Sequence, residues 1–206
     1  MNLASTAFLS VAAALGVARL STPARPAPAT AAAETFKVDP AHSSVVFHTK
    51  HLGISVIYGR FGKVAEASQL VYDRADPTKS TVLVVIDTAS VDTGNAERDQ
   101  HLRTPDFFSA KEFPEITFES KKIAAKGDAL EITGELNLHG VSKTITAQAH
   151  KVGEGDVAMF QDYRAGFLAE FTIDMRDFGI EFVKKNPTAV GPEATITVSL
   201  ECVRSK

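Results

Sequence analysis

The chain has 206 residues, of which 44% are hydrophobic and 23% charged, and its formal net charge at pH 7 is −3. These values are ordinary for a globular protein with one sizeable domain or two small ones. A weakly acidic chain without long basic runs offers no electrostatic basis for binding nucleic acid, so we expect no partner of that class.

Residues 1–33 differ in composition from the rest of the chain. The run from Ala7 to Ala18 contains only apolar or small residues. It is shorter than the roughly 20 residues of a membrane span and has the length of the apolar core of a secretory signal, although no Lys or Arg precedes it. A Pro- and Ala-rich stretch follows, with small-residue cleavage sites ending at Ala18 and Ala33. We expect a signal and leader over 1–33 and a folded domain over 34–206; the alternative is a disordered Ala/Pro leader.

From Phe36 onward, apolar and polar residues alternate with a period of two, which is typical of strands. The clearest segments are Leu130–Gly140 and Arg164–Met175, and Thr81–Thr93 is also expected to be one strand. Each strand then has one dry and one wet face, as in antiparallel sheets. About eight strands are expected, with turns at 73–79, 126–128, 139–140 and 153–155. A sheet of eight strands can close into a barrel whose interior holds side chains or one small ligand.

Small residues on the dry faces favour an internal cavity. They are Gly134, Ala147, Ala149 and Ala169. The alternative is that they only make room for opposing phenylalanines. Strands of about ten residues span roughly 33 Å, which suits an elongated guest. The only cysteine, Cys202, lies on a predicted dry face, where a thiol is usually inert.

The stretch from Arg98 to Phe118 combines charged residues and prolines with four phenylalanines. Asn95 is a plausible N-cap for a short helix that ends near Leu102. Thr104 and Pro105 favour a second helical turn that presents Phe107 and Phe108. We expect these short helical turns to close one end of the barrel with their aromatic side chains.

Several separated motifs resemble the YceI family, the periplasmic polyisoprenoid-binding proteins with a lipocalin-like barrel. The resemblance covers Phe36 to Val203. It is carried by Asp39–Ser43, His51–Phe61, Ser90–Ser120, Gly134–Lys143 and Arg164–Ile180. The resemblance implies an all-β, eight-stranded antiparallel barrel in the periplasm. It also implies a bound isoprenoid quinone or polyprenyl lipid and no catalytic cofactor. Transient contact with the membrane surface or with a membrane quinone enzyme would fit that role, and pairing of two barrels stays open.

Candidate ligand-binding residues fall into three groups. The wall residues are Val45, Phe47, Phe61, Val84, Ile86, Phe118, Leu136, Phe167, Ala169, Phe171 and Ile173. Phe107 and Phe108 would close the end over the lipid tail, and His51, Arg98 and His101 could donate hydrogen bonds to a head group. For the wall residues the alternative is simple core packing; for Arg98 it is an ion pair with Asp99.

Two other functional classes compete with a lipid binder. Six histidines suggest a metal-dependent enzyme, but HxH and HExxH spacings are absent, as is the Gly-x-Ser-x-Gly elbow of hydrolases. The Asp39 and His42 pair is interpreted as a device that starts a strand. The third class is a ligand-free, stress-related secreted protein whose barrel is filled by side chains.

Overall fold

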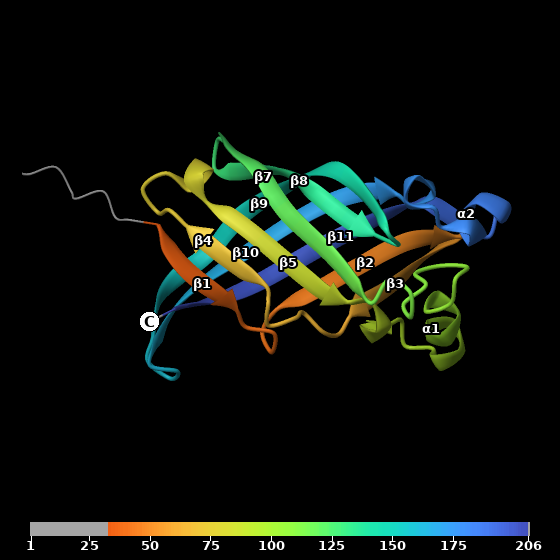
Figure 1. Cartoon of the computed structure of the whole chain (residues 1–206), viewed down its shortest axis with the longest axis horizontal. Coiled ribbons are helices and arrows are strands. Elements are labelled where there is room, and N and C mark those ends of the chain that lie inside the picture. The colour runs from red at the N-terminus through yellow and green to blue at the C-terminus, as the bar shows by residue number, and fades with distance from the viewer. Residues whose placement is uncertain (1–32, 206) are drawn as a thin grey trace, which may run out of the picture. The chain divides into compact units, whose positions relative to one another are not determined.

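The computed structural model describes residues 33–205, so the expected leader lies almost wholly outside the described residues. Within 33–205 the chain forms one antiparallel sheet and a few short helices (Figure 1). The strands are β1 (Glu34–Val38), β2 (Ser44–His51), β3 (Ser55–Phe61), β4 (Gln69–Tyr72), β5 (Thr81–Asp87), β6 (Val91–Asp92), β7 (Glu115–Lys126), β8 (Ala129–Leu138), β9 (Val141–Val157), β10 (Asp162–Asp174) and β11 (Val190–Arg204). The helices are α1 (Ala96–Leu102), α2 (Glu181–Lys185) and the 3-10 turns η1 (Pro77–Lys79), η2 (Thr88–Ser90) and η3 (Met175–Phe178).

Eight strands form a ring, in the order β1-β4-β5-β7-β8-β9-β10-β11, because β11 pairs back onto β1. On the side away from β10, strand β11 is long enough to pair with two strands. Its last residues pair with β1, and its earlier residues, from Val190 to Ser199, pair with β2. Beside the earlier part of β11, strands β2 and β3 continue the barrel wall. An isolated bridge between Val64 and Ile86 joins the segment after β3 to β5. The expected all-β antiparallel barrel is therefore confirmed.

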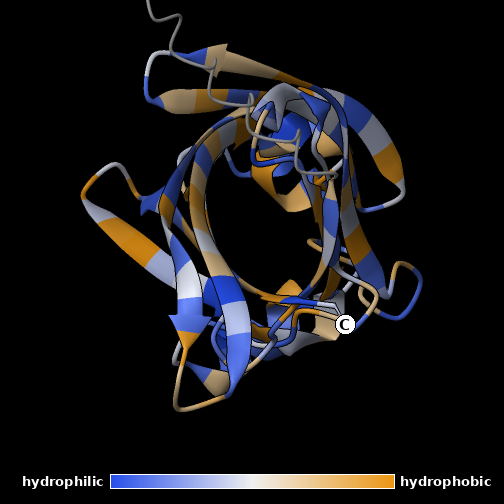
Figure 2. Cartoon of the chain, turned by 90° about the vertical axis from the view of Figure 1, so that its left-hand side faces the viewer, coloured by the Kyte–Doolittle hydropathy of each residue, from blue (hydrophilic) through white to orange (hydrophobic). Residues whose placement is uncertain are grey.

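The predicted alternation of dry and wet faces is also confirmed. In β10, Phe167, Ala169, Phe171 and Ile173 face the interior, and the intervening Glu170 is exposed. Figure 2 shows the ring end-on, with apolar and polar residues alternating along its strands. Each strand thus contributes every second side chain to one shared apolar interior.

The expected single strand from Thr81 to Thr93 is wrong, because a 3-10 turn interrupts it. The Asp87 side chain accepts a hydrogen bond from the backbone N–H of Ala89 at 2.9 Å, and the Ser90 hydroxyl donates to the Asp87 carbonyl at 2.6 Å. These local bonds compete with the strand ladder. The chain therefore leaves β5 at Asp87 and resumes as the two-residue β6.

The expected turn at Gly153–Gly155 is wrong as well. These glycines lie within β9, where Gly153 pairs with Gly166 and Gly155 with Arg164, and the reversal comes later, at 158–161. Neither glycine has a positive φ, whereas Gln161 in the true turn has φ 54°. Glycine permits a turn but does not require one.

Within the described residues, no helix is both long enough and apolar enough to cross a bilayer.

At the end where β10 begins, a cluster of charged side chains ties three strands together. Arg164 donates to Asp39 at 2.7 Å, to Glu201 at 2.5 Å and, through two nitrogens, to Asp162. Asp39 also accepts from the backbone of Ala41, and its carboxylate lies 2.9 Å from His42 Nδ1. The interpretation of Asp39 and His42 as a turn that starts β2 therefore agrees with the geometry.

This cluster predicts a loss of stability in acid. Partial burial alone would raise the pKa of Asp39, but hydrogen bonds from His42 and Arg164 outweigh it and lower the pKa to about 2. A carboxyl whose folded pKa lies below its unfolded value stabilises the fold above pH 4 and loses that contribution as the pH falls toward 2. We expect about 2 kcal/mol of unfolding free energy to disappear over this window, measured by urea denaturation. Asp39→Asn should lack this component; an unchanged pH dependence in that variant would contradict the assignment.

Candidate ligand site: an apolar cavity inside the barrel

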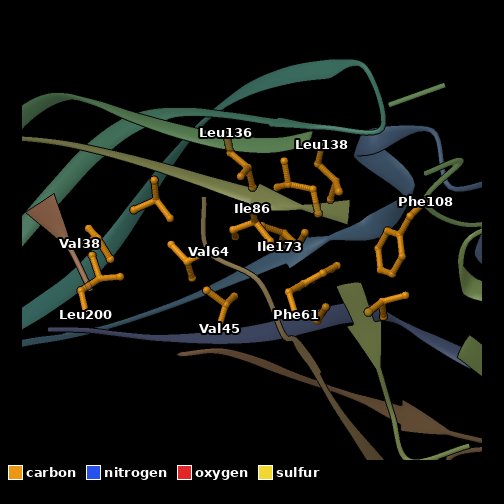
Figure 3. Close-up of a cluster of buried hydrophobic side chains, with 14 of the residues drawn as sticks. Val38, Val45, Phe61, Val64, Ile86, Phe108, Leu136, Leu138, Ile173 and Leu200 are labelled. Atoms are coloured by element: carbon orange, nitrogen blue, oxygen red, sulfur yellow. The ribbon is translucent and has the colours of Figure 1, made fainter. Parts of the chain in front are cut away.

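An elongated cavity of about 430 Å³ occupies the barrel interior. Its walls come from every strand of the ring except β1, and also from β2, β3, α1, α2 and the segments beside them. Figure 3 shows Ile86, Leu136 and Ile173, which come from three different strands, directed into the same interior. Along β10 the lining runs from Phe167 to Ile173, about 20 Å of strand. A volume in this range is typical of small-molecule sites.

Each residue selected from the sequence as a ligand contact lines this cavity. They are Val45, Phe47, His51, Phe61, Val84, Ile86, Arg98, His101, Phe107, Phe108, Phe118, Leu136, Phe167, Ala169, Phe171 and Ile173. The sequence therefore located the wall, because the dry face of a closed barrel is its interior. That these side chains contact a ligand stays a prediction.

The stretch from Arg98 to Phe118 lies over one end of the barrel, as expected, and narrows it with aromatic side chains. Phe108 packs against Phe61 and Phe47, with ring centroids 5.5 and 6.4 Å away. Phe107 stacks on Phe182 of α2 at 4.7 Å, and the backbone N–H of Phe182 donates to the Asp106 carbonyl at 3.1 Å. Two segments far apart in sequence thus meet over the end of the cavity.

Local structure in this stretch follows the sequence in part. The Asn95 side chain accepts from the backbone N–H of Arg98 and begins α1 as expected. The second turn at Pro105 is present and carries Phe107 and Phe108, with the backbone N–H of Phe107 donating to the Thr104 carbonyl at 3.1 Å, but it does not continue as a helix. The Thr104 hydroxyl donates to the His101 carbonyl at 2.7 Å. This bond satisfies a backbone carbonyl in the last turn of α1.

Arg98 and Asp99 do not pair with each other; both bind Thr93. Asp99 accepts from the backbone N–H and the hydroxyl of Thr93 at 2.8 and 2.6 Å. Arg98 donates to the Thr93 hydroxyl and carbonyl oxygens at 2.7 and 2.8 Å. The alternative of a direct ion pair is therefore wrong, although a local structural role for both side chains is evident. Two of the three guanidinium nitrogens of Arg98 are engaged in this way.

The basic residues of the lining lie together at the α1 and α2 end of the cavity. They are Lys50, His51, Arg98 and His101. Lys50 and His101 are exposed, whereas Leu70, Tyr72 and Ser80 at the opposite end are buried. His101 lies 3.1 Å from the Asp106 carboxylate and packs edge-on against Phe107 and Phe182. The cavity therefore has a polar mouth beside α1 and α2 and an apolar far end.

The far end is closed by a second aromatic cluster that the sequence did not reveal. Phe36 lies edge-on to Tyr72 and Tyr163, and Tyr72 lies edge-on to Phe167 at 5.3 Å. Cys202 is fully buried beside this cluster, and burial raises the pKa of its thiol to about 12, as an inert cysteine requires.

The small residues of the dry face divide into two kinds. Ala147, Ala149 and Ala169 line the cavity, as expected from their size. Gly134 does not, because the Phe118 ring occupies the space that a side chain there would need: a Cβ on Gly134 would lie 2.5 Å from the Phe118 ring and 2.5 Å from the Glu119 carbonyl. For Gly134 the interpretation as room along the axis is wrong and the alternative, an opposing phenylalanine, is right.

Gly134→Ala should therefore destabilise the barrel. The added methyl meets a backbone carbonyl that cannot turn away, so we expect the free energy of unfolding to fall by about 1–3 kcal/mol. Urea denaturation measures this. Gly153→Ala is the matched control, because a Cβ there meets nothing within 4 Å. Equal stability of the two variants would contradict the close packing of Phe118.

Some lining residues carried too little sequence signal to be selected. Tyr72 lies on the four-residue β4, where Leu70 and Tyr72 give only one repeat of the period. Phe182 lies on α2, a five-residue helix whose N-cap residue, Ile180, makes no side-chain capping bond. A longer alternation would have identified Tyr72 as an inward residue, and a capping residue would have identified the helix that carries Phe182.

A metal centre has little support among the described residues. The one group with suitable spacing is Asp39, His42 and Glu201, and Arg164 donates to both of its carboxylates. A guanidinium therefore occupies the place where a cation would bind. His48 faces outward and packs against Tyr58, whereas His51 faces the cavity, as the alternation predicts.

A closed antiparallel barrel around an elongated apolar cavity defines the class of lipocalin-like proteins. The YceI-like domain model matches residues 36–202. The chain belongs to the YceI family.

Individual relatives agree with this membership. The chain is 39% identical to Protein YceI of Escherichia coli O157:H7 over 181 residues, which cover 85% of this chain and 90% of the relative. The crystal structure of Burkholderia cenocepacia BcnA matches with a TM-score of 0.71 and 26% identity, covering 80% of this chain and 98% of that one. A polyisoprenoid binding domain from Saccharophagus degradans, implicated in plant cell wall breakdown, matches with a TM-score of 0.60 over 82% of this chain and 98% of that one; at 15% identity it shows the shared fold alone.

Proposed function

We propose that this protein binds one long isoprenoid lipid, a ubiquinone-type quinone or a polyprenyl chain, inside its barrel and stores or carries it in the periplasm without chemical change. The observation that carries the proposal is the continuous apolar cavity whose basic lining groups lie at one end only. Such a site fits a ligand with a long hydrocarbon tail and one small polar head. Membership of the YceI family supports the same class of ligand.

Binding would follow from burial rather than from chemistry. Transfer of hydrocarbon from water into an apolar site stabilises a complex by about 25 cal/mol per Å² of buried surface. The barrel wall is already formed by paired strands, so little of this gain is lost in ordering the protein. We infer that the tail extends toward Leu70 and Tyr72. The head group would lie near His51, Arg98 and His101.

In this orientation the mouth residues divide their roles. Arg98 is held against Thr93, so its remaining nitrogen could donate to a head-group oxygen from a fixed position. His101 is oriented by Asp106 and by two aromatic rings. Phe107 and Phe182 would pack on the part of the tail nearest the mouth.

Solvent extraction of protein purified from its native source, followed by mass spectrometry, tests the proposal. We expect an isoprenoid lipid in near-stoichiometric amount. A tightly held metal would instead support an enzyme, and a protein free of both would support a barrel that serves no ligand. Location in the periplasm is part of the same proposal; N-terminal sequencing of the exported protein would show whether cleavage follows Ala18 or Ala33.

A further inference from the structure

The hairpin formed by β2 and β3 exposes an unusual set of apolar side chains. Leu52 is 54% exposed, Ile54 86%, Val56 46% and Tyr58 63%. Leu52 and Gly53 adopt φ of 53° and 68°, and the backbone N–H of Ile54 donates to the His51 carbonyl at 3.0 Å. This tight turn directs Leu52 and Ile54 outward from the end of the barrel, with Val56 and Tyr58 on its outer flank. We call these four residues the hairpin tip.

The hairpin tip lies at the mouth of the cavity. Lys50, His51 and Ile57, which line the cavity, belong to the same hairpin. The backbone N–H of Leu52 donates to the carbonyl of Ala189, and His51 pairs with Val190, both of which also line the cavity. In Figure 1 the ends of β2 and β3 lie beside α2, at the same end of the barrel as α1. The hairpin tip and the entrance to the cavity therefore lie at the same end of the molecule.

Positive charge accompanies the hairpin tip, in a chain whose net charge is negative. Lys50 is exposed at the rim of the mouth and pairs with Val56 on β3. Lys184 and Lys185, both exposed, follow on α2, where a single carboxylate, Glu181, pairs with both. An apolar tip flanked by Lys50, Lys184 and Lys185 is complementary to a bilayer surface that contains anionic lipids, and a tyrosine at the edge of the tip suits the interfacial region.

We propose that the hairpin tip docks this protein onto an anionic lipid bilayer and places the mouth of the cavity against the membrane. A bilayer fits the tip better than a second copy of the chain does. A stable protein interface buries about 20–30 residues on each side, whereas the tip is a narrow convex turn with four exposed apolar side chains. The headgroup region of a bilayer accepts such a tip because it yields around inserted side chains.

This inference rests on the proposed function and adds a route for the ligand. An isoprenoid lipid is insoluble in water, so its tail must pass between bilayer and cavity without crossing bulk solvent. With the tip inserted, the basic groups at the mouth would face the headgroups, and the lipid would pass between bilayer and cavity through that mouth.

Flotation with vesicles of phosphatidylethanolamine and phosphatidylglycerol tests the docking surface. We expect wild-type protein to float with these vesicles. The double variant Leu52→Asp and Ile54→Asp should bind at least about tenfold more weakly, because two apolar contacts are lost and two acids face an anionic surface. Met159→Asp is the matched control: Met159 is 84% exposed in the hairpin between β9 and β10, at the opposite end of the barrel. It should float like wild type.

The outcomes separate this inference from the proposed function when the same preparations are extracted for lipid. Wild-type protein that carries an isoprenoid lipid but floats no better than the double variant overturns the docking surface and leaves the proposed function standing. Hairpin-dependent flotation of a protein that carries no lipid supports the docking surface and contradicts the proposed function. A double variant that changes from dimer to monomer in sedimentation while floating normally assigns the tip to a second copy and overturns the inference.

Discussion

Ala169→Trp is expected to remove most bound isoprenoid lipid while leaving the barrel folded. Ala169 faces the cavity midway along β10, between Phe167 and Phe171, and its register neighbours are Ala149 on β9 and Val198 on β11. Because small side chains meet at this level, an indole placed there would project across the lumen. Extraction and mass spectrometry should show lipid content reduced at least about tenfold, since the tail would lose contacts along the whole far end.

The adjacent position provides the control for this variant. Glu170 is exposed on the outer face of the same strand, so Glu170→Trp adds the same ring without entering the cavity. It should retain wild-type lipid content, and both variants should keep the β-sheet circular dichroism of the parent. Equal lipid content in Ala169→Trp and wild type would show that the tail does not pass this level of the barrel.

Alternation predicted the wall of the cavity well for a physical reason. In a closed antiparallel sheet, one face of every strand points to the interior. Apolar residues at every second position identify that face, even when the neighbouring strands are unknown. Long strands such as β8, β10 and β11 repeat the pattern often enough to be read. Their inward residues, including Leu136, Phe167 and Ile196, therefore follow from sequence alone.

The interior contents could not be predicted in the same way, because they depend on which strands face each other. Gly134 and Ala169 look alike in sequence, as small residues on dry faces. Only the packing of Phe118 over Gly134 shows that one site is filled and the other faces open space. Likewise, the far aromatic cluster joins Phe36, Tyr72 and Tyr163 from three separated segments, and nothing local marks these residues as neighbours.

Hydrogen bonds explain why two predictions were wrong, that of a single strand over 81–93 and that of a turn at 153–155. At Asp87 and Ser90, side chains bond to the backbone and end a β-branched segment that would otherwise read as one strand. At Gly153 and Gly155 the ladder with β10 extends the strand through residues that more often mark turns. The capping signal of Asn95 succeeded because the whole interaction lies within four residues.

Arg164→Met should cause the largest loss of stability among these variants. The Arg164 side chain is 11% exposed, donates to three carboxylates and lies 4.0 Å above the Phe160 ring. Its removal would leave Asp39, Asp162 and Glu201 facing one another without the guanidinium that bridges them. Breaking a largely buried ion pair by removal of one partner costs about 3–5 kcal/mol. Because the carboxylates are partly exposed, we expect a loss at the lower end of this range, about 3 kcal/mol.

Arg176→Met distinguishes this loss from the general effect of removing an arginine. Arg176 binds a single carboxylate, that of Asp174, and its side chain is 51% exposed, so solvent screens the pair and Arg176→Met should cost much less stability than Arg164→Met. Urea denaturation at pH 7 compares the two variants. Arg164→Lys should recover only part of the lost stability, because an ammonium cannot reach three carboxylates with the fixed geometry of a guanidinium. If Arg164→Met and Arg176→Met cost the same, the cluster does not hold the three strands together. In that case the far end of the barrel is stabilised by the aromatic packing of Phe36, Tyr72 and Tyr163.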